Sequence, residues 1–342
     1  MKDELTFDDL ALIAGGHSAF QLLWSGIQLG VFNLLSKTPS INLQKVADGI
    51  GIEHQPARIL MVGLTTLRLV EKNGDTFTNS KIIEQLLVSD SPENMIDVLG
   101  WQYHIVYPAE MDFLESLKSH SNVGLRNFAG SEDNLYARLA HDPKLEKIFH
   151  DAMSSLSDSA NKLLAANVSF DEVNHLVDAG GGDGTNAITL SKANPHLKLT
   201  VFDAPSVCER AIKNIEAAGL SNRIDTSPGD FFETDFPPGI DAIIFAHMMI
   251  IWSAEKDTAL LKRAYDALPD GGRVIIFNMM AYDDDTGPMT AALGSPYFLT
   301  IATGLGMMYS WKDYESFLQQ AGFTQTYRQE LPRDHGVLIG IK

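Results

Sequence analysis

The chain has 342 residues, of which 45% are hydrophobic and 20% charged, which is enough apolar material for two globular domains with separate cores. Its 26 Lys and Arg residues stand against 44 Asp and Glu residues, and a surface with a net charge of −18 repels nucleic-acid phosphates and anionic lipid. The single cysteine, Cys208, excludes a disulfide within one chain and a cysteine-based metal cluster.

The start of the chain, MKDELTFDDL, is acidic where a secretion signal would be basic and then apolar. No run of apolar residues is long enough to cross a membrane as a helix. We therefore expect a cytoplasmic protein with no membrane, nucleic-acid or metal partner, which binds small molecules or a second copy of itself.

The first part of the chain, residues 1–95, is expected to be mostly helical. One helix face is predicted by apolar residues at spacings i, i+3, i+4, i+7 and i+11, which are Phe20, Leu23, Trp24, Ile27 and Val31. Two short helical patterns then flank Gly51, and Leu69-Val70 leads through Asn73-Gly74 to Thr76-Phe77-Thr78, which predicts a hairpin. Together these elements resemble a winged helix.

A DNA-binding winged helix is an alternative interpretation of the same segment. Between residues 43 and 81 the basic side chains are Lys45, Arg58, Arg68, Lys72 and Lys81, and the acidic ones are Asp48, Glu53, Glu71 and Asp75. Because contact with phosphates requires a clear basic excess, this balance disfavours DNA binding.

The remaining chain changes its pattern at about residue 170. Residues 96–168 are predicted to be helical, with a long amphipathic pattern interrupted at Pro143, and to roof a pocket. In residues 169–342, short apolar runs such as HLVDA, LTVFDA, DAIIFAH and GRVIIFNMM alternate with helical stretches. This alternation predicts an α/β domain with a parallel sheet, and Thr324–Leu331 and Gly336–Ile341 predict a closing antiparallel hairpin.

A glycine-rich turn follows the first predicted strand of this domain. His175 to Ala179 lead into GGGDG at 180–184 and then into a helix, so backbone amides lie at a helix N-terminus that a ligand can approach. Asp203 ends the next strand, beside the position of a cofactor's ribose. A dinucleotide fingerprint requires a third glycine at the sixth position, where this chain has Thr185, so the spacing disfavours a dinucleotide oxidoreductase.

The pattern Asp178-x-Gly180-x-Gly182-x-Gly184 resembles the first motif of class I methyltransferases. The blocks VDAGGGDGT (177–185), VFDAPSV (201–207), GDFFETDFPPGIDAII (229–244), LPDGGRVII (268–276) and AGF (321–323) resemble the dimeric plant and bacterial O-methyltransferases, in order and over almost the whole chain. The resemblance implies a Rossmann-like sheet behind a winged-helix dimerisation domain, S-adenosylmethionine as cofactor, a homodimer, and a role in bacterial secondary metabolism.

The resemblance also implies a set of cofactor-binding residues. Gly180 and Gly182 would approach the methionine part, Asp203 with the adjacent Ala204 would hold the ribose diol, Asp230 and Phe231 would frame the adenine, and Ala246 and His247 would line the cofactor after the fourth strand. Two simpler interpretations stay open, namely that Phe231 belongs to the core and that Asp230 caps a helix.

The chain departs from the family at the catalytic signature, a His-Asp-Trp tripeptide whose histidine is the general base. Trp252 aligns, but Ile250 and Ile251 precede it, and the two carboxylates that orient the histidine fall at Asn278 and Met308. None of these side chains can accept a proton. The resemblance places the substrate pocket at His104, Met153, Met249, Ile250, Asn278 and Met308.

Three histidines, His247, His104 and His150, are alternative candidates for the base, although each could instead be a packing or surface residue. The pocket region is also rich in methionine, which indicates either ordinary core packing or an adaptable surface for a flat polycyclic ligand; these residues are Met153, Met248, Met249, Met279, Met280, Met307 and Met308.

The sequence leaves two enzymatic hypotheses. One is methyl transfer to an acidic phenol, such as an anthraquinone or a naphthoate, which reacts without a protein base. The other is a non-methylating rearrangement or cyclisation assisted by bound S-adenosylmethionine.

Overall fold

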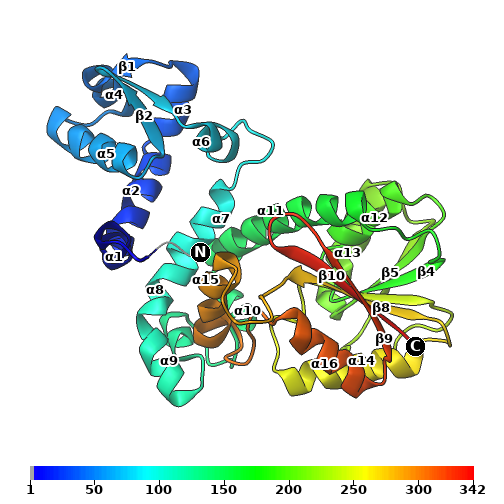
Figure 1. The fold of residues 1–342 in the computed structure, drawn as a ribbon. Helices are drawn as coiled ribbons and strands as arrows, with labels where there is room; N and C mark the ends of the chain where they lie inside the picture. The colour runs from blue at the N-terminus through cyan, green and yellow to red at the C-terminus, as the bar shows by residue number, and fades with distance from the viewer. Residues whose placement is uncertain (1–3) are drawn as a thin grey trace. The chain divides into compact units, whose positions relative to one another are not determined.

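Residues 4–342 are described by a computed structural model in which the chain divides into two compact units, Met1–Tyr103 and His104–Lys342 (Figure 1). We call them the N-terminal and C-terminal units. The π-helical segment η1, Gln102–Val106, carries the chain from one to the other.

The N-terminal unit is a set of short helices around a small antiparallel sheet of order β1-β3-β2. Its hairpin pairs Asn73 with Thr76, so Gly74 and Asp75 form a two-residue turn, and Gly74 has a φ of +57°. The predicted hairpin and the helices on either side of Gly51 are therefore confirmed. The elements are α1 Phe7–Ala14, α2 Gly16–Gln28, α3 Val31–Lys37, β1 Ile41–Asn42, α4 Leu43–Ile50, α5 His54–Thr66, β2 Val70–Asn73, β3 Thr76–Asn79, α6 Lys81–Leu86 and α7 Ile96–Trp101.

The apolar stripe predicted between Phe20 and Val31 packs inside this unit. Trp24 and Val31 are buried, and Ile27 packs against the core formed by α3, α5 and the hairpin. Exposed apolar residues lie on the preceding helix instead, since α1 buries none of its side chains and Phe7 is 82% and Ile13 is 70% exposed. Helix α5 also exposes Ile59 and Val62. No single described helix is long and apolar enough to cross a membrane; only α1 and α2 taken together, bent by 67°, pass that test on length and composition.

The first part of the C-terminal unit is a series of helices that ends in a long helix, α11. Pro143 occupies the first turn of this helix, where its missing N–H leaves no intrahelical bond unmade, so the predicted interruption is a helix start. The elements are α8 Tyr107–Ala109, η2 Glu110–Asp112, α9 Phe113–Ser119, η3 Val123–Asn127, α10 Leu135–Leu139 and α11 Pro143–Asn167.

The sheet of the C-terminal unit has seven strands in the order β6-β5-β4-β7-β8-β10-β9, and only β10 and β9 run antiparallel to their neighbours. The predicted parallel sheet and closing hairpin are confirmed. The strands are β4 His175–Ala179, β5 Lys198–Asp203, β6 Ile224–Pro228, β7 Ala242–Ala246, β8 Arg273–Met279, β9 Gln325–Glu330 and β10 His335–Ile341, and the helices are α12 Thr185–Ala193, α13 Pro205–Ala217, α14 Ala254–Ala267, α15 Met289–Tyr297 and α16 Trp311–Ala321, with π-helical η4 Phe298–Ala302.

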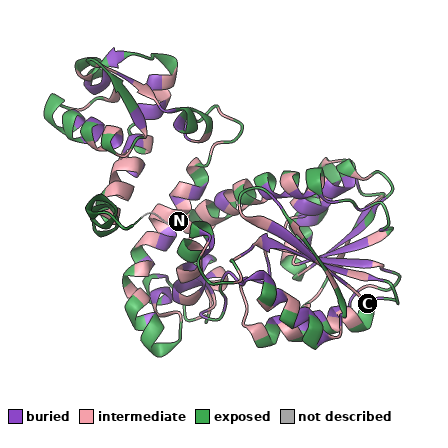
Figure 2. Cartoon of the chain, in the orientation of Figure 1, coloured by how far each residue is buried: buried purple, intermediate pink, exposed green. Residues whose placement is uncertain are grey.

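Helices cover both faces of this sheet, so its central strands are buried (Figure 2). One core lies between the sheet and α14 with α16, and the other between the sheet and α11, α12 and α13. The strand order reverses between β4 and β7, and in sheets of this kind ligands bind at the carboxyl ends of the strands beside such a reversal. The fold therefore places a candidate site at the ends of β4, β5, β7 and β8.

Candidate active site

The turn after β4 exposes its backbone to a ligand. Gly180 and Gly182 have φ values of +70° and +60°, a region that side chains other than glycine rarely adopt. A Cβ added at Gly180 would lie 3.0 Å from Met248 Cγ, whereas a Cβ at Gly182 would meet no atom within 4 Å. The open space beside Gly182 is what close approach of a cofactor to the backbone requires.

Asp203 at the end of β5 faces this turn. Its Oδ2 accepts a hydrogen bond from the Gly182 amide at 2.9 Å, and its Oδ1 accepts one from the Ala204 amide at 2.7 Å. Burial raises the pKa of Asp203, while these two bonds and the charge of Arg210 oppose the rise. Each carboxylate oxygen keeps a lone pair, so the side chain can still accept hydrogen bonds from a ribose diol.

Asp178 lies beneath the same turn. It is buried and accepts one side-chain hydrogen bond, from Asn186 Nδ2 at 3.1 Å. Burial, opposed by that bond and reinforced by Asp203, raises the pKa of Asp178 to about 7. A Cβ added at Gly181 would lie 2.8 Å from Asp178 Cγ, so this carboxyl group leaves no room for a side chain at Gly181.

Asp230 and Phe231 follow β6 at the same edge of the sheet. Asp230 Oδ1 accepts the amide of Phe232 at 2.8 Å, so this side chain closes a turn. The described chain has no helix between β6 and β7, so the interpretation of Asp230 as a helix cap is wrong. The half-buried ring of Phe231 meets Phe202 edge to face, at 6.5 Å between centroids, and rests against the core. Both residues lie where the resemblance places an adenine.

The chain leaves β7 through Ala246, which is half-buried, and His247, whose φ is +55°. The His247 ring packs against Phe277 and His335, at 4.7 and 5.2 Å between centroids. Phe277 and Asn278 are consecutive residues of β8, so their side chains face opposite sides of the sheet. Because His247 packs against Phe277, it lies on the Phe277 side and not on the side of Asn278. Burial and the neighbouring His335 lower the pKa of His247 to about 3, which makes it a poor general base.

The position of the family's catalytic histidine, Ile250, is buried and its main chain is held by the segment that precedes α16. Thr303 Oγ1 donates to the Ile251 carbonyl oxygen, and the Tyr309 hydroxyl donates to the Trp252 carbonyl oxygen at 2.9 Å. We call residues 303–309 the strap.

The positions of the two orienting carboxylates are buried as well. Asn278 is fully buried, and its Nδ2 donates to the Tyr314 hydroxyl at 3.0 Å. Met308 is buried against Gly294, where an added Cβ would lie 2.8 Å from Met308 Cε. At all three positions the chain has a neutral side chain that cannot accept a proton.

The other predicted pocket residues lie on three separate segments of the C-terminal unit. Met249 is fully buried in the core beside α14, together with Met248 and Met280, so much of the methionine-rich region is core packing. Met153 is half-buried on α11, and His104 is half-buried in η1, where burial and Lys144 lower its pKa.

His150, also on α11, has its Nε2 3.2 Å from Arg210 Nη1. A guanidinium only donates, so the lone pair of this histidine is already used.

Sequence reasoning missed a buried acid, Asp257, and two tyrosines, Tyr309 and Tyr314. A signal was present, because Asp257 shares the spacing i, i+3, i+4 with Leu260 and Leu261 and therefore falls on the apolar face of α14.

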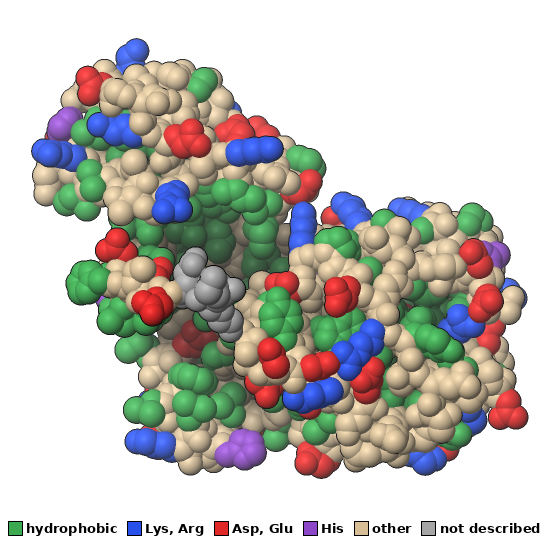
Figure 3. Space-filling model, viewed as in Figure 1, with side chains coloured by type: hydrophobic (Ala, Val, Ile, Leu, Met, Phe, Trp, Pro, Cys, Tyr) green, Lys and Arg blue, Asp and Glu red, His purple; other side chains and the backbone are tan. Residues whose placement is uncertain are grey.

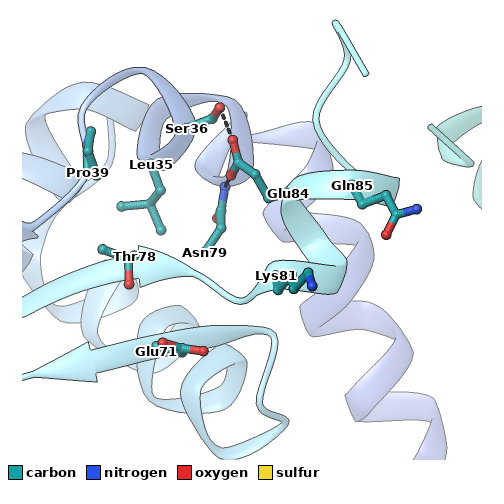
Figure 4. A pocket seen from close by; sticks show the side chains of 9 residues that line it. All are labelled: Leu35, Ser36, Pro39, Glu71, Thr78, Asn79, Lys81, Glu84 and Gln85. Carbon is teal, nitrogen blue, oxygen red and sulfur yellow. Dashed lines mark hydrogen bonds between the residues drawn. The ribbon is translucent and has the colours of Figure 1, made fainter. Parts of the chain in front are cut away.

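The N-terminal unit has a groove between α3, β3 and α6, shown in Figure 4. Two acidic side chains, Glu71 and Glu84, are among those that line it. Glu84 accepts hydrogen bonds from Ser36 Oγ and, at 2.7 Å, from Asn79 Nδ2, so both of its carboxylate oxygens are engaged. The groove contains none of the predicted site residues.

The chain is similar to known proteins in sequence and in structure. Residues 118–324 match the O-methyltransferase domain family. The chain is 39% identical over 345 residues to the L-tyrosine C(3)-methyltransferase of Streptomyces lavendulae, covering 100% of this chain and 94% of that protein. It is 29% identical over 332 residues to the 3-hydroxy-5-methyl-1-naphthoate 3-O-methyltransferase of Streptomyces sahachiroi, covering 96% of this chain and 94% of that protein.

Solved structures are similar over the whole chain. The S-adenosylmethionine-dependent methyltransferase SibL, in its apo form, has a TM-score of 0.89 at 38% identity, covering 98% of this chain and 99% of that one. Human N-acetylserotonin methyltransferase in complex with S-adenosylmethionine has a TM-score of 0.83 at 22% identity, covering 100% and 99%, and supports the fold alone.

Proposed function

The chain belongs to the O-methyltransferase domain family of S-adenosylmethionine-dependent methyltransferases, and we propose that it methylates a small phenolic natural product at the ring carbon beside the hydroxyl. The observation that carries this choice of atom is the absence of a proton acceptor at Ile250, Asn278 and Met308. The 39% identical relative, matched over its length, is named for methylation of a carbon. Methylation of the hydroxyl oxygen is the second candidate, favoured by the naphthoate relative.

S-adenosylmethionine, when bound, supplies an electrophilic methyl group on a positively charged sulfur. We propose that the turn at Gly180 and Gly182, with open space beside Gly182, accommodates its methionine part, and that Asp203, with Ala204 beside it, accepts hydrogen bonds from the ribose diol. Asp230 and Phe231 would frame the adenine. Ala246 and the enclosed ring of His247 would complete the wall at the end of β7.

The chemistry of phenols explains why a neutral pocket suits attack by carbon. Attack by oxygen requires that the hydroxyl proton leaves as the O–C bond forms, and Ile250 cannot take that proton. In attack by the adjacent ring carbon, the oxygen would donate electron density into the ring, a C–C bond would form as the bond from the methyl carbon to sulfur breaks and S-adenosylhomocysteine is released, and the ring proton would then leave to solvent. Base catalysis typically contributes about 10²–10⁴-fold, whereas correct positioning can supply roughly 7–11 kcal/mol, so positioning can dominate.

Substrate acidity would reduce the need for a base further. A phenol with a pKa near 10 costs about 4 kcal/mol to ionise at neutral pH, whereas one with a pKa near 8 costs only about 1 kcal/mol. An ionised phenol is activated at both the oxygen and the adjacent carbon, and the placement of the ring in the pocket decides between them.

The test is product analysis with S-adenosylmethionine carrying a labelled methyl group. The protein is incubated with L-tyrosine, a hydroxynaphthoate and a hydroxyanthraquinone, and products are identified by mass and by NMR, which distinguishes a methyl on a ring carbon from a methoxy group. A ring-methylated product with one equivalent of S-adenosylhomocysteine is expected. Methoxy products alone would establish the second candidate, and altered aromatic products with S-adenosylmethionine left intact would establish the non-methylating hypothesis.

We further propose that the protein is a homodimer built largely from its N-terminal unit. The support is the exposed apolar surface of the first helix, to which Leu5, Leu10 and Leu12 also contribute, each more than half exposed. Figure 3 shows apolar side chains gathered over α1 and, in the C-terminal unit, over α9. Surfaces of this kind on soluble proteins usually mark an interface.

A further inference from the structure

Asp257 on α14 is an anomaly in the core. Its exposed fraction is 0%, it lies among apolar neighbours on the inner face of the helix, and neither carboxyl oxygen has a hydrogen-bond partner among residues 4–342. Burial raises the pKa of Asp257 to about 9. Buried polar groups almost always have partners, so an acid retained here without one requires an explanation.

Two tyrosines with incomplete hydrogen bonding share this part of the core. The ring centroids of Tyr309 and Tyr314 are 5.7 Å apart. Burial raises the pKa of each tyrosine, and among the charged groups Asp257 raises it most. The other acidic groups acting on these tyrosines are Glu255 from α14 and Asp313 from α16, and no basic group acts on either.

The hydrogen-bonding capacity of the three side chains is complementary. Tyr309 donates its hydroxyl hydrogen to the Trp252 carbonyl oxygen, and its oxygen also faces the backbone amide of Ala254, so it can form a further bond only by accepting through its remaining lone pair. Tyr314 uses its oxygen to accept from Asn278, so its hydroxyl hydrogen is free to be donated. A protonated carboxyl group has one donor and one acceptor, which matches both needs, whereas a carboxylate could serve only Tyr314.

We propose that Asp257 is held as an uncharged carboxylic acid that joins Tyr309 to Tyr314 and thereby fixes the main chain at Trp252 and the amide of Asn278. A rotation of the Asp257 side chain, or one bridging water, completes the two bonds. The acid would thus act as a positioning residue behind the loop where relatives carry their base. Its effect on catalysis rests on the function proposed above, whereas its protonation state and its effect on the loop do not.

The orientation of Asn278 follows from this arrangement. If the Tyr314 hydroxyl donates its hydrogen to Asp257, the Tyr314 oxygen can form a bond with Asn278 only by accepting it. Asn278 must therefore turn Nδ2 towards Tyr314. The Asn278 carbonyl oxygen then points away from Tyr314.

The first experiment tests the protonation state by stability. Urea unfolding of the wild type and of Asp257→Asn is measured from pH 5 to pH 8. Between the ordinary carboxyl pKa of 3.8 and the raised value of about 9, the unfolded chain is ionised at this residue while the native chain is not. This difference destabilises the wild type progressively as pH rises, and the ratio of the unfolding constants of wild type and Asp257→Asn should therefore grow about tenfold per pH unit. A ratio that does not change with pH overturns the proposal.

The second experiment separates positioning from simple packing. Asp257→Asn keeps one donor and one acceptor, and Asp257→Leu fills the space with neither. Hydrogen exchange at residues 248–253 should be as slow in Asp257→Asn as in the wild type and at least tenfold faster in Asp257→Leu, even if the leucine variant melts at a higher temperature. Tyr309→Phe removes the Tyr309 hydroxyl and with it both the bond to Trp252 and the proposed link to Asp257, so this variant should reproduce the faster exchange.

Activity gives the third measurement, on the phenol that the wild type methylates fastest. We expect kcat of Asp257→Asn within about threefold of the wild type and kcat of Asp257→Leu lower by at least tenfold, with calorimetric affinity for S-adenosylhomocysteine unchanged in both. Wild-type exchange and wild-type kcat in Asp257→Leu would overturn the positioning role. If no phenol is methylated at all, the proposed function fails while the stability and exchange measurements still decide the role of Asp257.

Discussion

Three aspartates near the site show how the same side chain acquires different properties from its surroundings. Asp203 accepts hydrogen bonds from two backbone amides, and Asp178 accepts one from a side-chain amide. Asp257 accepts none from residues 4–342. Hydrogen bonds to a carboxylate favour its charged form and burial disfavours it. The pKa accordingly rises to about 7 at Asp178 and to about 9 at Asp257.

The role of Asp203 can be tested by cofactor binding. Asp203→Ala removes the acceptor for two ribose hydroxyls, and charge-assisted bonds of this kind should together contribute roughly 2–4 kcal/mol. Calorimetry with S-adenosylhomocysteine measures the loss, and Asp225→Ala, an exposed aspartate on β6, is the control. Unchanged affinity in Asp203→Ala, or tight binding of a nicotinamide dinucleotide, would refute the assigned cofactor site.

His247 should not be the base. Its ring is enclosed by Phe277 and His335, and its low pKa leaves little basicity. His247→Gln keeps hydrogen bonding, so the chemical step should stay within about tenfold of the wild type, measured by single turnover to exclude product release. A loss of about 10³-fold with cofactor affinity intact would identify His247 as the base after all.

Ile250→His restores the histidine of the family's signature but not the two carboxylates that orient it. The new imidazole would be buried and would find no carboxylate at Asn278 or Met308 to orient it, so its pKa would fall and it should give little gain on acidic phenols. Initial rates from pH 6 to pH 9 test this expectation. A rise of orders of magnitude from this one change would show that the pocket still positions a base.

At the scale of elements, the sequence predicted the repeating strands and helices because their apolar runs are long and buried on both faces. It did not predict β6, since the run IDTSP is polar and this edge strand pairs only with β5. The strap and Asp257 were also missed, because contacts between residues 303–309 and the loop after β7 depend on tertiary structure. The sequence alone showed which neutral residues stand at the positions of the base and its carboxylates. It did not show which contacts hold the loop after β7.

The strap predicts a sensitive glycine. A Cβ added at Gly306 would lie 2.1 Å from the Ile250 carbonyl oxygen, so Gly306→Ala must displace the strap or the loop after β7. We expect a loss of roughly 1–3 kcal/mol in unfolding free energy, together with reduced kcat. Gly16→Ala, at the start of α2 with no atom within 4 Å, is the control, and equal behaviour of the two variants in urea unfolding would contradict the contact.

At the scale of the whole molecule, the chain combines a strongly acidic composition with exposed apolar side chains on its first helix. A net charge of −18 opposes non-specific association, so any stable association should be a specific interface that buries the apolar residues. Leu23, Ile27 and Val31 of the apolar stripe pack within the N-terminal unit, whereas α1 buries none of its side chains and is the surface that we propose for the interface.

Sedimentation at micromolar concentration tests the homodimer. An obligate interface should bury well over ~2,000 Å² and be rich in apolar side chains, so charges placed at its centre should disrupt it. Phe7→Glu with Ile13→Glu should therefore shift the protein from dimer to monomer, whereas Lys45→Glu, an exposed change in the same unit, should not. A wild-type protein that sediments as a monomer would refute the homodimer. A dimer that survives both substitutions on α1 would place the interface elsewhere. The next surface to charge is formed by the exposed apolar side chains of Met111 on η2 and of Leu114 and Leu117 on α9.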